Sequence, residues 1–293
     1  MSEELLPSMA RARELFMGLV AEIRPELHRY CARMTGNVFD GEDVVQDTLA
    51  KACFALSQMA EPPPLRPWLF RIAHNTAMDF LRRYERTHVD LVAEVPEVAG
   101  SADRGPDPAL VEAALAAFVV LPPVQRSALV LKDVLGHSLD ETAATMGATI
   151  PAVKAALVRA RANIADAAPA APSVSAVELE KLRRYADLFN AHDWDGLRAL
   201  LGEEARLDVV SRTQRRGREV GTYYGKYAEI APTEQLRAEA GLADGLPVIA
   251  CFRPGATRPA WFVRLEWDAG RVVSIRDFRY VPYIAQGARY SRA

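Results

Sequence analysis

The chain has 293 residues and a mass of 32.2 kDa, which predicts two or three domains. Half of the residues are hydrophobic (50%) and a quarter are charged (25%), a composition that excludes a disordered, collagen-like or coiled-coil protein. The net charge of −2 provides no overall field for nucleic acid, so any DNA contact must come from local basic patches.

No stretch of the sequence reaches the roughly 18 apolar residues of a membrane span, and the N-terminus lacks a secretory signal pattern. The cysteines Cys31, Cys53 and Cys251 have no disulfide-framework spacing and fit a reducing cytoplasm. His28 and Cys31 form an H-x-x-C without a second ligand pair, and there is no glycine-rich phosphate loop. We therefore expect a cytoplasmic protein with no metal, no cofactor and no membrane partner.

Two stretches rich in proline and small residues divide the chain into three pieces. Residues 89–109 are acidic and lack a helical pattern, and residues 166–176 form a Pro/Ala/Ser spacer. The predicted organisation is a first domain over 1–90, an acidic linker over 91–108, a second domain over 109–167, a short linker over 168–177 and a third domain over 178–293.

The first piece has the apolar spacing of helices. A second helix can be capped by Asp40, and a third is expected over 68–85. Between them, the four prolines in 57–67 forbid a continuous helix. The first helix is predicted by the apolar series Leu15, Leu19, Ile23 and Leu27.

The second piece has the pattern of a helix-turn-helix. A helix over 124–135 ends at Gly136, and the next begins with the capping box Ser138-x-x-Glu141. After Gly147 comes a last helix, which Thr149 can cap and which has Pro151 in its first turn.

This last helix is amphipathic. Val153, Leu157, Ala160 and Ile164 share one face, whereas the opposite face is rich in alanine and basic residues. Such a helix can enter a major groove, with its basic side chains neutralising phosphates. The alternative is a plain helical hairpin with a solvated basic face. The basic residues of that face are Lys154, Arg159 and Arg161.

Two polar groups stand out in the first piece. Its second helix carries a stripe that, taken alone, fits a solvent-exposed face, and its third helix is basic with Trp68 at its start. Basic residues beside an aromatic suit melted DNA, whose bases flip out and stack; alternatively, Trp68 belongs to the core. The stripe consists of Asp43, Gln46, Asp47 and Lys51. The polar residues of the third helix include Arg71, His74, Asn75, Arg82, Arg83 and Arg86.

The third piece changes to the period of strands. After helices over 178–192 and 194–201, strand-like runs follow, separated by turn residues. The predicted fold class is therefore multidomain: two all-α domains, the second a helix-turn-helix, followed by an α+β domain. The strand-like runs cover 205–211, 246–253, 260–267 and 270–281.

Three segments carry a resemblance. GEDVVQDTLAKACFAL, RPWLFRIAHNTAMDFLRR and LPPVQRSALVLKDVLGHSLDETAATMGATIPAVKAALVRARANI resemble a bacterial sigma factor of the extracytoplasmic-function (ECF) group, over about residues 10–167. The resemblance implies that the first domain binds the clamp helices of the largest RNA polymerase subunit and captures the melted −10 element. It implies that the second domain binds the polymerase flap and reads the −35 element.

The resemblance also assigns residues by position. Asp43, Gln46 and Asp47 would face the polymerase clamp. The −10 reader would comprise the loop 58–67 with Trp68, Arg71, Asn75, Arg82 and Arg83. The −35 reader would comprise Thr149, Pro151, Lys154, Ala155, Arg159 and Arg161. The loop is unusually proline-rich, and Ala155 and Ala156 stand where relatives often carry Ser or Arg, so promoter sequence does not transfer.

The third piece resembles a SnoaL-like domain, the cone-shaped α+β fold shared with ketosteroid isomerases and polyketide cyclases. YADLFNAHDWDGLRALLGEEARLDVV and GRVVSIRDFRY carry this likeness, over about residues 178–285. It implies a regulatory domain that acts in place of, or beside, an anti-sigma factor. An acid in its pocket could be a general base, but an aspartate on a strand is more often a turn or salt-bridge partner. Candidate pocket residues are Asp208, Tyr223, Tyr224, Tyr227, Trp261 and Asp277.

The sequence thus predicts a non-enzymatic sigma factor with core polymerase and promoter DNA as partners, and an anti-sigma factor as a further candidate. The alternative is a DNA-binding repressor or sensor fused to a small-molecule-binding or isomerase/cyclase-type domain. The paired polymerase and −10 segments favour the sigma factor, because a repressor needs neither. Residues 1–169 carry a charge of −5 and residues 170–293 a charge of +3, which favours docking between tethered domains.

Overall fold

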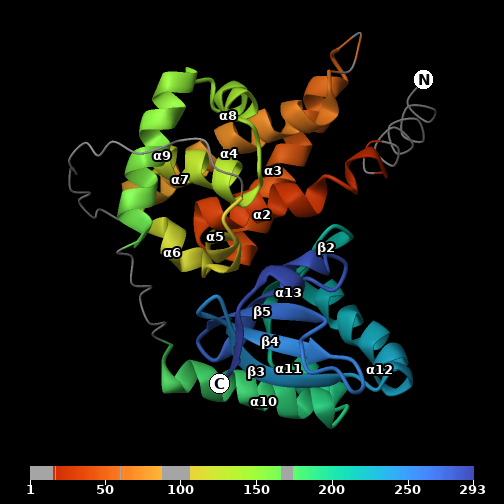
Figure 1. The fold of residues 1–293 in the computed structure, drawn as a ribbon. Coiled ribbons are helices and arrows are strands. Elements are labelled where there is room, and N and C mark those ends of the chain that lie inside the picture. The colour runs from red at the N-terminus through yellow and green to blue at the C-terminus, as the bar shows by residue number, and fades with distance from the viewer. Residues whose placement is uncertain (1–15, 17, 60, 62, 88–105, 166–173) are drawn as a thin grey trace, which may run out of the picture. The chain divides into compact units, whose positions relative to one another are not determined.

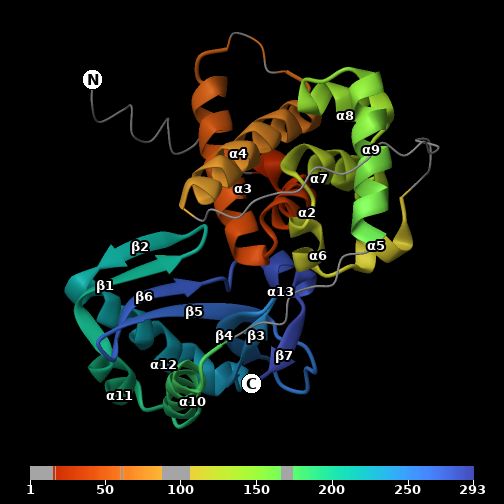
Figure 2. The ribbon, with the colours of Figure 1, turned by 90° about the vertical axis from the view of Figure 1, so that its left-hand side faces the viewer.

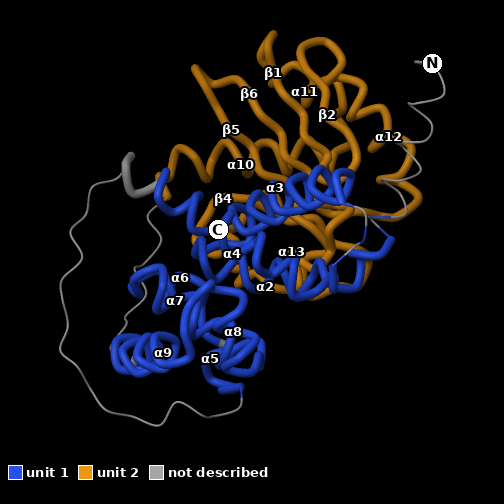
Figure 3. Tube along the Cα trace, turned by 90° about the horizontal axis from the view of Figure 1, so that it is seen from above, with its two compact units in different colours: residues 1–170 blue, residues 171–293 orange. Residues whose placement is uncertain are grey.

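The computed structural model describes residues 16, 18–59, 61, 63–87, 106–165 and 174–293 (Figure 1). The chain forms two compact units, Met1–Ala170 and Ala171–Ala293, shown in separate colours in Figure 3. The two predicted helical domains share a hydrophobic core and both lie in the first unit, whereas the second unit has its own core. The predicted linkers over 91–108 and 168–177 lie mostly outside the described residues.

The first lobe of the helical unit consists of α2 (Arg24–Thr35), α3 (Val38–Leu56) and α4 (Leu65–Thr87). The predicted continuous helix through Leu19 and Leu27 is wrong: residues 21–23 form a turn, and Leu19 is 68% exposed. The break has a physical reason, since Pro25 lies in the first turn of α2, where its missing N–H costs no helical hydrogen bond. Leu15 lies outside the described residues.

The cap of α3 also differs from the prediction. Asn37, not Asp40, caps the helix, because its Oδ1 accepts hydrogen bonds from the N–H groups of Phe39 (3.0 Å) and Asp40 (2.9 Å). Asn and Asp are equally good caps, so spacing alone could not separate them. Asp40 instead lies in the first turn, where its charge suits the positive helix end and its carboxylate accepts Asn37 Nδ2 at 2.8 Å.

The second lobe of the helical unit is built from short helices. The predicted helix over 124–135 is interrupted: its second half is a π-helical turn in which the N–H of Leu135 donates to the carbonyl of Val130 (3.0 Å). The capping box of Ser138 and Glu141 is confirmed, and Gly147 ends that helix with a left-handed φ of 61°. The elements are α5 (Pro108–Glu112), α6 (Leu115–Val119), α7 (Pro123–Leu129), η1 (Val130–Val134), α8 (Leu139–Met146) and α9 (Ile150–Ala165).

The second unit is an α+β domain, as predicted. A seven-stranded sheet has the order β2-β1-β6-β5-β4-β3-β7; β1 and β6 are parallel and the other neighbours antiparallel. Figures 1 and 2 show α10, α11 and α12 on one face of this sheet, where the core of the unit lies. The strands are β1 (Leu201–Val209), β2 (Thr213–Arg216), β3 (Arg237–Ala243), β4 (Leu246–Phe252), β5 (Trp261–Asp268), β6 (Arg271–Asp277) and β7 (Tyr290–Arg292). The helices are α10 (Ala176–Asn190), α11 (Trp194–Ala199), α12 (Thr222–Glu234) and α13 (Tyr283–Gly287), with a 3-10 turn, η2, over Gly217–Gly221.

Sequence reasoning missed five of the strands and α-helices of this unit, β2, β3, β7, α12 and α13, as well as the turn η2. The edge strand β2 reads TQRR and contains no apolar residue, so no alternation marks it. Strand β3 reads RAEAGLA, in which alanine and glycine have low strand propensity. These segments are ordered by pairing with neighbours rather than by their own preference.

Candidate promoter-binding and polymerase-binding surfaces and a C-terminal pocket

The helix α9 has the amphipathic form that the sequence predicts. Val153, Leu157 and Ala160 are fully buried, whereas Lys154 is exposed on the other side. Thr149 caps the helix, since its Oγ1 accepts the N–H of Ala152 at 3.3 Å. Of the remaining predicted −35 residues, Pro151 and Ala155 are exposed and Arg159 is half-buried.

Arg161 has a different environment from the other predicted −35 residues. Its guanidinium holds Asp133 of η1 in a two-pronged ion pair, Nη2–Oδ1 at 2.7 Å and Nε–Oδ2 at 2.8 Å. The Asp133 side chain is only 4% exposed, and its hydrogen bond raises the pKa of Arg161. Arg161 therefore joins α9 to η1, with its guanidinium already paired within the protein.

The predicted −10 residues lie along one side of α4. Trp68, Arg71 and Asn75 are spaced by three and four residues, so their side chains share a helix face, and both Arg71 and Asn75 are exposed. Trp68 is half-buried, and with Arg71 it lines a pocket of about 310 Å³ that also includes His137 and Glu141 of the second lobe. The predicted −10 face thus lies against the start of the helix-turn-helix.

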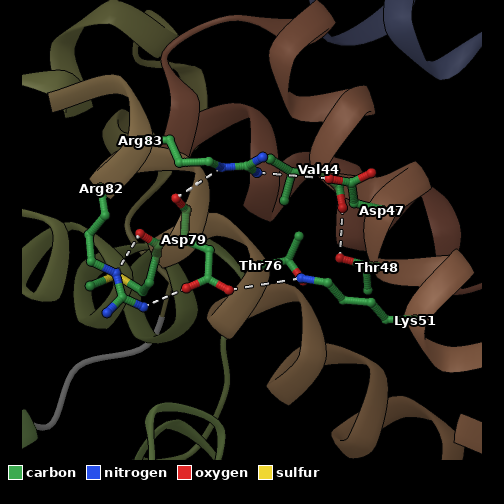
Figure 4. A network of polar contacts seen from close by, with 9 residues as sticks. Val44, Asp47, Thr48, Lys51, Thr76, Asp79, Arg82 and Arg83 are labelled. Atoms are coloured by element: carbon green, nitrogen blue, oxygen red, sulfur yellow. Dashed lines mark hydrogen bonds and ion pairs between the residues drawn. The ribbon is translucent and has the colours of Figure 1, made fainter. Parts of the chain in front are cut away.

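Arg82 and Arg83, at the far end of α4, pair with acidic residues (Figure 4). Arg82 binds Asp79 at 2.5 Å, and Arg83 lies 4.0 Å from Asp47 of α3. Lys51 of α3 lies 3.9 Å from Asp79. All of these side chains are at least half-exposed, and exposed pairs contribute at most about 1 kcal/mol, so they can exchange for DNA or protein contacts.

The predicted polymerase-binding stripe lies on the outer side of α3. Asp47 is 58% exposed, and Asp43 and Gln46 are half-buried; Gln46 Nε2 donates to Glu42 Oε1 at 3.4 Å. Val45 and Leu49, on the other side, are buried. The stripe does not contribute to the core, which is the property that a binding surface requires.

A buried polar cluster between the lobes was not predicted from the sequence. The hydroxyl of Tyr30 lies 3.0 Å from His74 Nδ1 and 2.8 Å from Ser127 Oγ, and His74 Nδ1 lies 3.0 Å from Ser127 Oγ. Burial lowers the pKa of His74 to about 4, so the ring is neutral near pH 7. These three residues come from α2, α4 and α7, and they join the two lobes.

Two arginines add to this junction. Arg66 of α4 donates to Glu26 (Nη2–Oε1 at 2.6 Å) and to His137 Nε2 of the second lobe (3.2 Å). Buried Arg126 of α7 donates Nη1 to the carbonyl oxygen of Met34 in α2. Separating charged groups from several hydrogen-bond partners costs free energy, so these contacts hold the two lobes together as one body in this structure.

The C-terminal unit contains a pocket of about 330 Å³ beside α12, and three of the predicted residues line it. Asp277, 2% exposed, accepts hydrogen bonds at Oδ2 from the hydroxyls of Tyr223 (2.9 Å) and Tyr227 (2.8 Å). The N–H of Arg279 donates to its other oxygen, Oδ1, at 2.9 Å. Burial raises the pKa of the Asp277 carboxyl.

The other candidate pocket residues do not line this cavity. Asp208 alternates with the pocket-lining Leu207 and Val209 along β1, so its side chain points to the opposite face of the sheet. There its carboxylate lies 3.5 Å from the Nε of Arg276 in a salt bridge. Trp261 is buried against the guanidinium of Arg279, 4.8 Å from the ring centroid. Tyr224 is buried, with its hydroxyl 3.1 Å from that of Tyr185.

The described residues contain no group of three or more His, Cys, Asp or Glu side chains placed to hold a metal ion. Within the same residues, no helix combines the length and the apolar character that crossing a membrane requires.

Comparison with known proteins identifies the family. Residues 19–87 match sigma-70 region 2, and residues 112–164 match sigma-70 region 4. The ECF RNA polymerase sigma factor SigG of Mycobacterium tuberculosis H37Rv is 32% identical, in an alignment that covers 78% of this chain and 71% of SigG. SigM of the same strain is 34% identical, covering 56% of this chain and 82% of SigM. The chain therefore belongs to the ECF RNA polymerase sigma factors, and it directs promoter-specific initiation of transcription.

The SigG match extends past the helical unit, because that unit holds 170 of the 293 residues and the match covers 78% of the chain. Among solved structures, RpoE of Bartonella quintana in complex with the anti-sigma factor NepR is 27% identical, with a TM-score of 0.39 over 51% of this chain and 93% of that chain. SigJ of Mycobacterium tuberculosis is 22% identical, with a TM-score of 0.34 over 88% of this chain and 95% of that chain.

Proposed function

We propose that this sigma factor reads the −35 element with the exposed face of α9 and the −10 element with α4, and that it binds core polymerase through α3. The observation that carries the proposal is that α9 has two distinct faces: Val153 and Leu157 lie in the core, whereas Lys154 is exposed to solvent. The outer face of α9 is therefore available to a major groove. The proposed polymerase contacts are the clamp helices of the largest subunit and the flap, and the proposed site of action is the cytoplasm.

We further propose that the junction between the lobes holds the free protein in a closed form. Promoter elements 25 base pairs apart are separated by roughly 85 Å at 3.4 Å per base pair. A compact unit of 170 residues is only about 40 Å across. Reading both elements therefore requires the contacts of Tyr30, His74 and Ser127 to open when polymerase binds.

Regulation by the C-terminal domain is the third part of the proposal. The oxygens of Asp277 already accept three hydrogen bonds from the protein, two at Oδ2 and one at Oδ1, which supports a binding rather than a catalytic role. RpoE of Bartonella quintana was solved in complex with the anti-sigma factor NepR, and we propose an anti-sigma protein as a further partner of this chain.

The test is in vitro transcription with core polymerase on a library of promoter variants. We expect initiation from a subset of promoters with conserved spacing between two elements, and co-elution of the protein with core polymerase. DNA binding without co-elution or initiation would instead indicate a repressor with a sensor domain.

A further inference from the structure

We propose that the pocket of the C-terminal domain binds a small organic anion with an aromatic ring, of the aromatic carboxylate class. This inference goes beyond the sigma function and does not depend on it.

The pocket wall carries more positive charge than its neighbours neutralise. Arg212 and Arg215 both line the cavity, and their recorded partners among the described residues are uncharged. Arg212 lies over the ring of Tyr280 (4.6 Å to the centroid), and Arg215 donates to the hydroxyl of Thr222. Lys226, also in the lining, has an exposed pair with Glu229 at 3.0 Å. Guanidinium groups of this kind bind a carboxylate in a two-pronged geometry.

Arg279 adds a buried donor. Its Nη2 donates to Glu234 at 2.7 Å, but its buried Nη1 has no hydrogen-bond partner in the described part of the chain. The guanidinium also lies over the rings of Tyr227 and Trp261, which hold its positive charge at the pocket wall.

Asp277 does not reverse this preference. Its Oδ2 accepts two tyrosine hydroxyls and its Oδ1 accepts a backbone N–H, so its oxygens are occupied within the protein. A cationic ligand would have to compete with these three donors for Asp277, whereas an anionic ligand would meet the arginines. We therefore expect the ligand to be negatively charged.

The remaining residues of the pocket lining favour a ligand with an aromatic ring. Leu207, Val209 and Ile230 supply aliphatic surface, and the rings of Tyr223 and Tyr227 supply aromatic surface. A volume of about 330 Å³ is at the small end of the range of roughly 300–1,000 Å³ for ligand pockets. A one- or two-ring carboxylate combines the size, the apolar body and the charge that this surface matches.

Isothermal titration calorimetry of the full-length protein tests the proposal with 2-naphthoate and its neutral isostere 2-naphthamide. We expect naphthoate to bind at least about tenfold more tightly than the amide, since only naphthoate can pair with the arginines. Equal affinities, or no binding of naphthoate at millimolar concentration, would overturn the proposal. This comparison needs no variant and no polymerase, so it is independent of transcription activity.

Paired variants locate the site. Arg215→Gln, alone and with Arg212→Gln, should weaken naphthoate binding about tenfold or more. Arg216→Gln is the matched control, because Arg216 is the next residue of β2, is exposed and does not line the pocket. Its affinity should stay within about twofold of the unaltered protein. An equal loss in Arg216→Gln, or no loss in the double variant, would contradict binding in this pocket.

Discussion

His74 makes the junction between the lobes sensitive to pH. It is 7% exposed, and burial lowers its pKa to about 4, against about 6.5 in an unfolded chain. For a histidine with a depressed pKa, the stabilising contribution is complete above pH 6.5 and is lost as the pH falls toward 4. Protonation would also add a charge beside Tyr30 and Ser127 in the core.

We therefore predict that acidification from pH 7 to pH 5 lowers the free energy of unfolding of the helical unit by about 2 kcal/mol through His74 alone. Hydrogen exchange of amides in α2 and α7 measures it. His74→Gln, which stays neutral, should remove this part of the pH dependence. Burial also lowers the pKa values of His28 and His137, whose contributions remain in the variant. Equal pH dependence in both proteins would show that His74 is not responsible.

Unlike the exposed residues of α9, Arg161 should contribute to the stability of the fold. Arg161→Ala would leave the carboxylate of Asp133, 4% exposed, without its ion pair. The expected cost is about 1–3 kcal/mol of stability, since an unpaired buried acceptor loses its hydrogen bonds. Urea unfolding followed by circular dichroism measures this loss. A variant as stable as the unaltered protein would return Arg161 to the candidate DNA contacts.

At the scale of the element, the outer face of α9 should govern −35 recognition without supporting the fold. Lys154→Ala or Arg159→Ala should weaken binding to the −35 element by about 1–3 kcal/mol if a base edge is read. Lys154 is exposed, so its removal should leave the unfolding midpoint unchanged. Gel-shift titration and initiation assays on −35-dependent promoters measure the effect, and unchanged initiation in both variants would contradict the assignment of α9.

The stripe of α3 should matter to polymerase and not to folding. Asp47→Arg reverses a charge that is 58% exposed and whose partner, Arg83, is 66% exposed, so the helix content should stay native. We expect weaker binding to core polymerase, measured by co-elution or fluorescence anisotropy.

A matched control for Asp47→Arg is Glu180→Arg on α10. Glu180 is likewise an exposed acid, 75% accessible, paired with an exposed arginine, Arg183, at 3.7 Å. Glu180→Arg should leave the polymerase affinity unaltered. If the two reversals have the same effect on polymerase binding, the stripe is an ordinary solvated face.

At the scale of the whole molecule, the two units have separate cores, so truncation after Ala168 should leave the helical fold intact. The charges of −5 over 1–169 and +3 over 170–293 favour association of the units, with a short tether raising the effective concentration to about the millimolar range. We predict that the C-terminal unit, the tail of the protein, restrains the free protein and contributes to promoter activity when polymerase is bound.

Small-angle scattering and transcription on the truncated and full-length chains check this prediction. We expect each lobe of residues 1–168 to keep its helices, the two lobes to be held together less tightly than in the full-length protein, and promoter activity to be altered. If both properties match the full-length protein, the tail has no regulatory role.

Several features of the fold follow from local sequence. Ser138, Glu141 and Gly147 bound α8 because capping and the left-handed turn depend on neighbouring residues alone. The buried face of α9 follows from periodicity, since Val153, Leu157 and Ala160 recur at helical spacing. The cap of α3 was predicted wrongly because Asn and Asp are similarly good caps, and the break before α2, which Pro25 marks, was missed.

What the sequence by itself determined is the family, the order of helical and α+β parts, and the polar stripes on α3, α4 and α9, all of which are encoded in short segments. Only the tertiary structure decided the partners of these residues. It joined Tyr30, His74 and Ser127 across 97 positions, paired Arg161 with Asp133, and placed Asp277 rather than Asp208 in the pocket. The physical reason is that burial and hydrogen bonding depend on contacts between segments far apart in the chain, which no local pattern specifies.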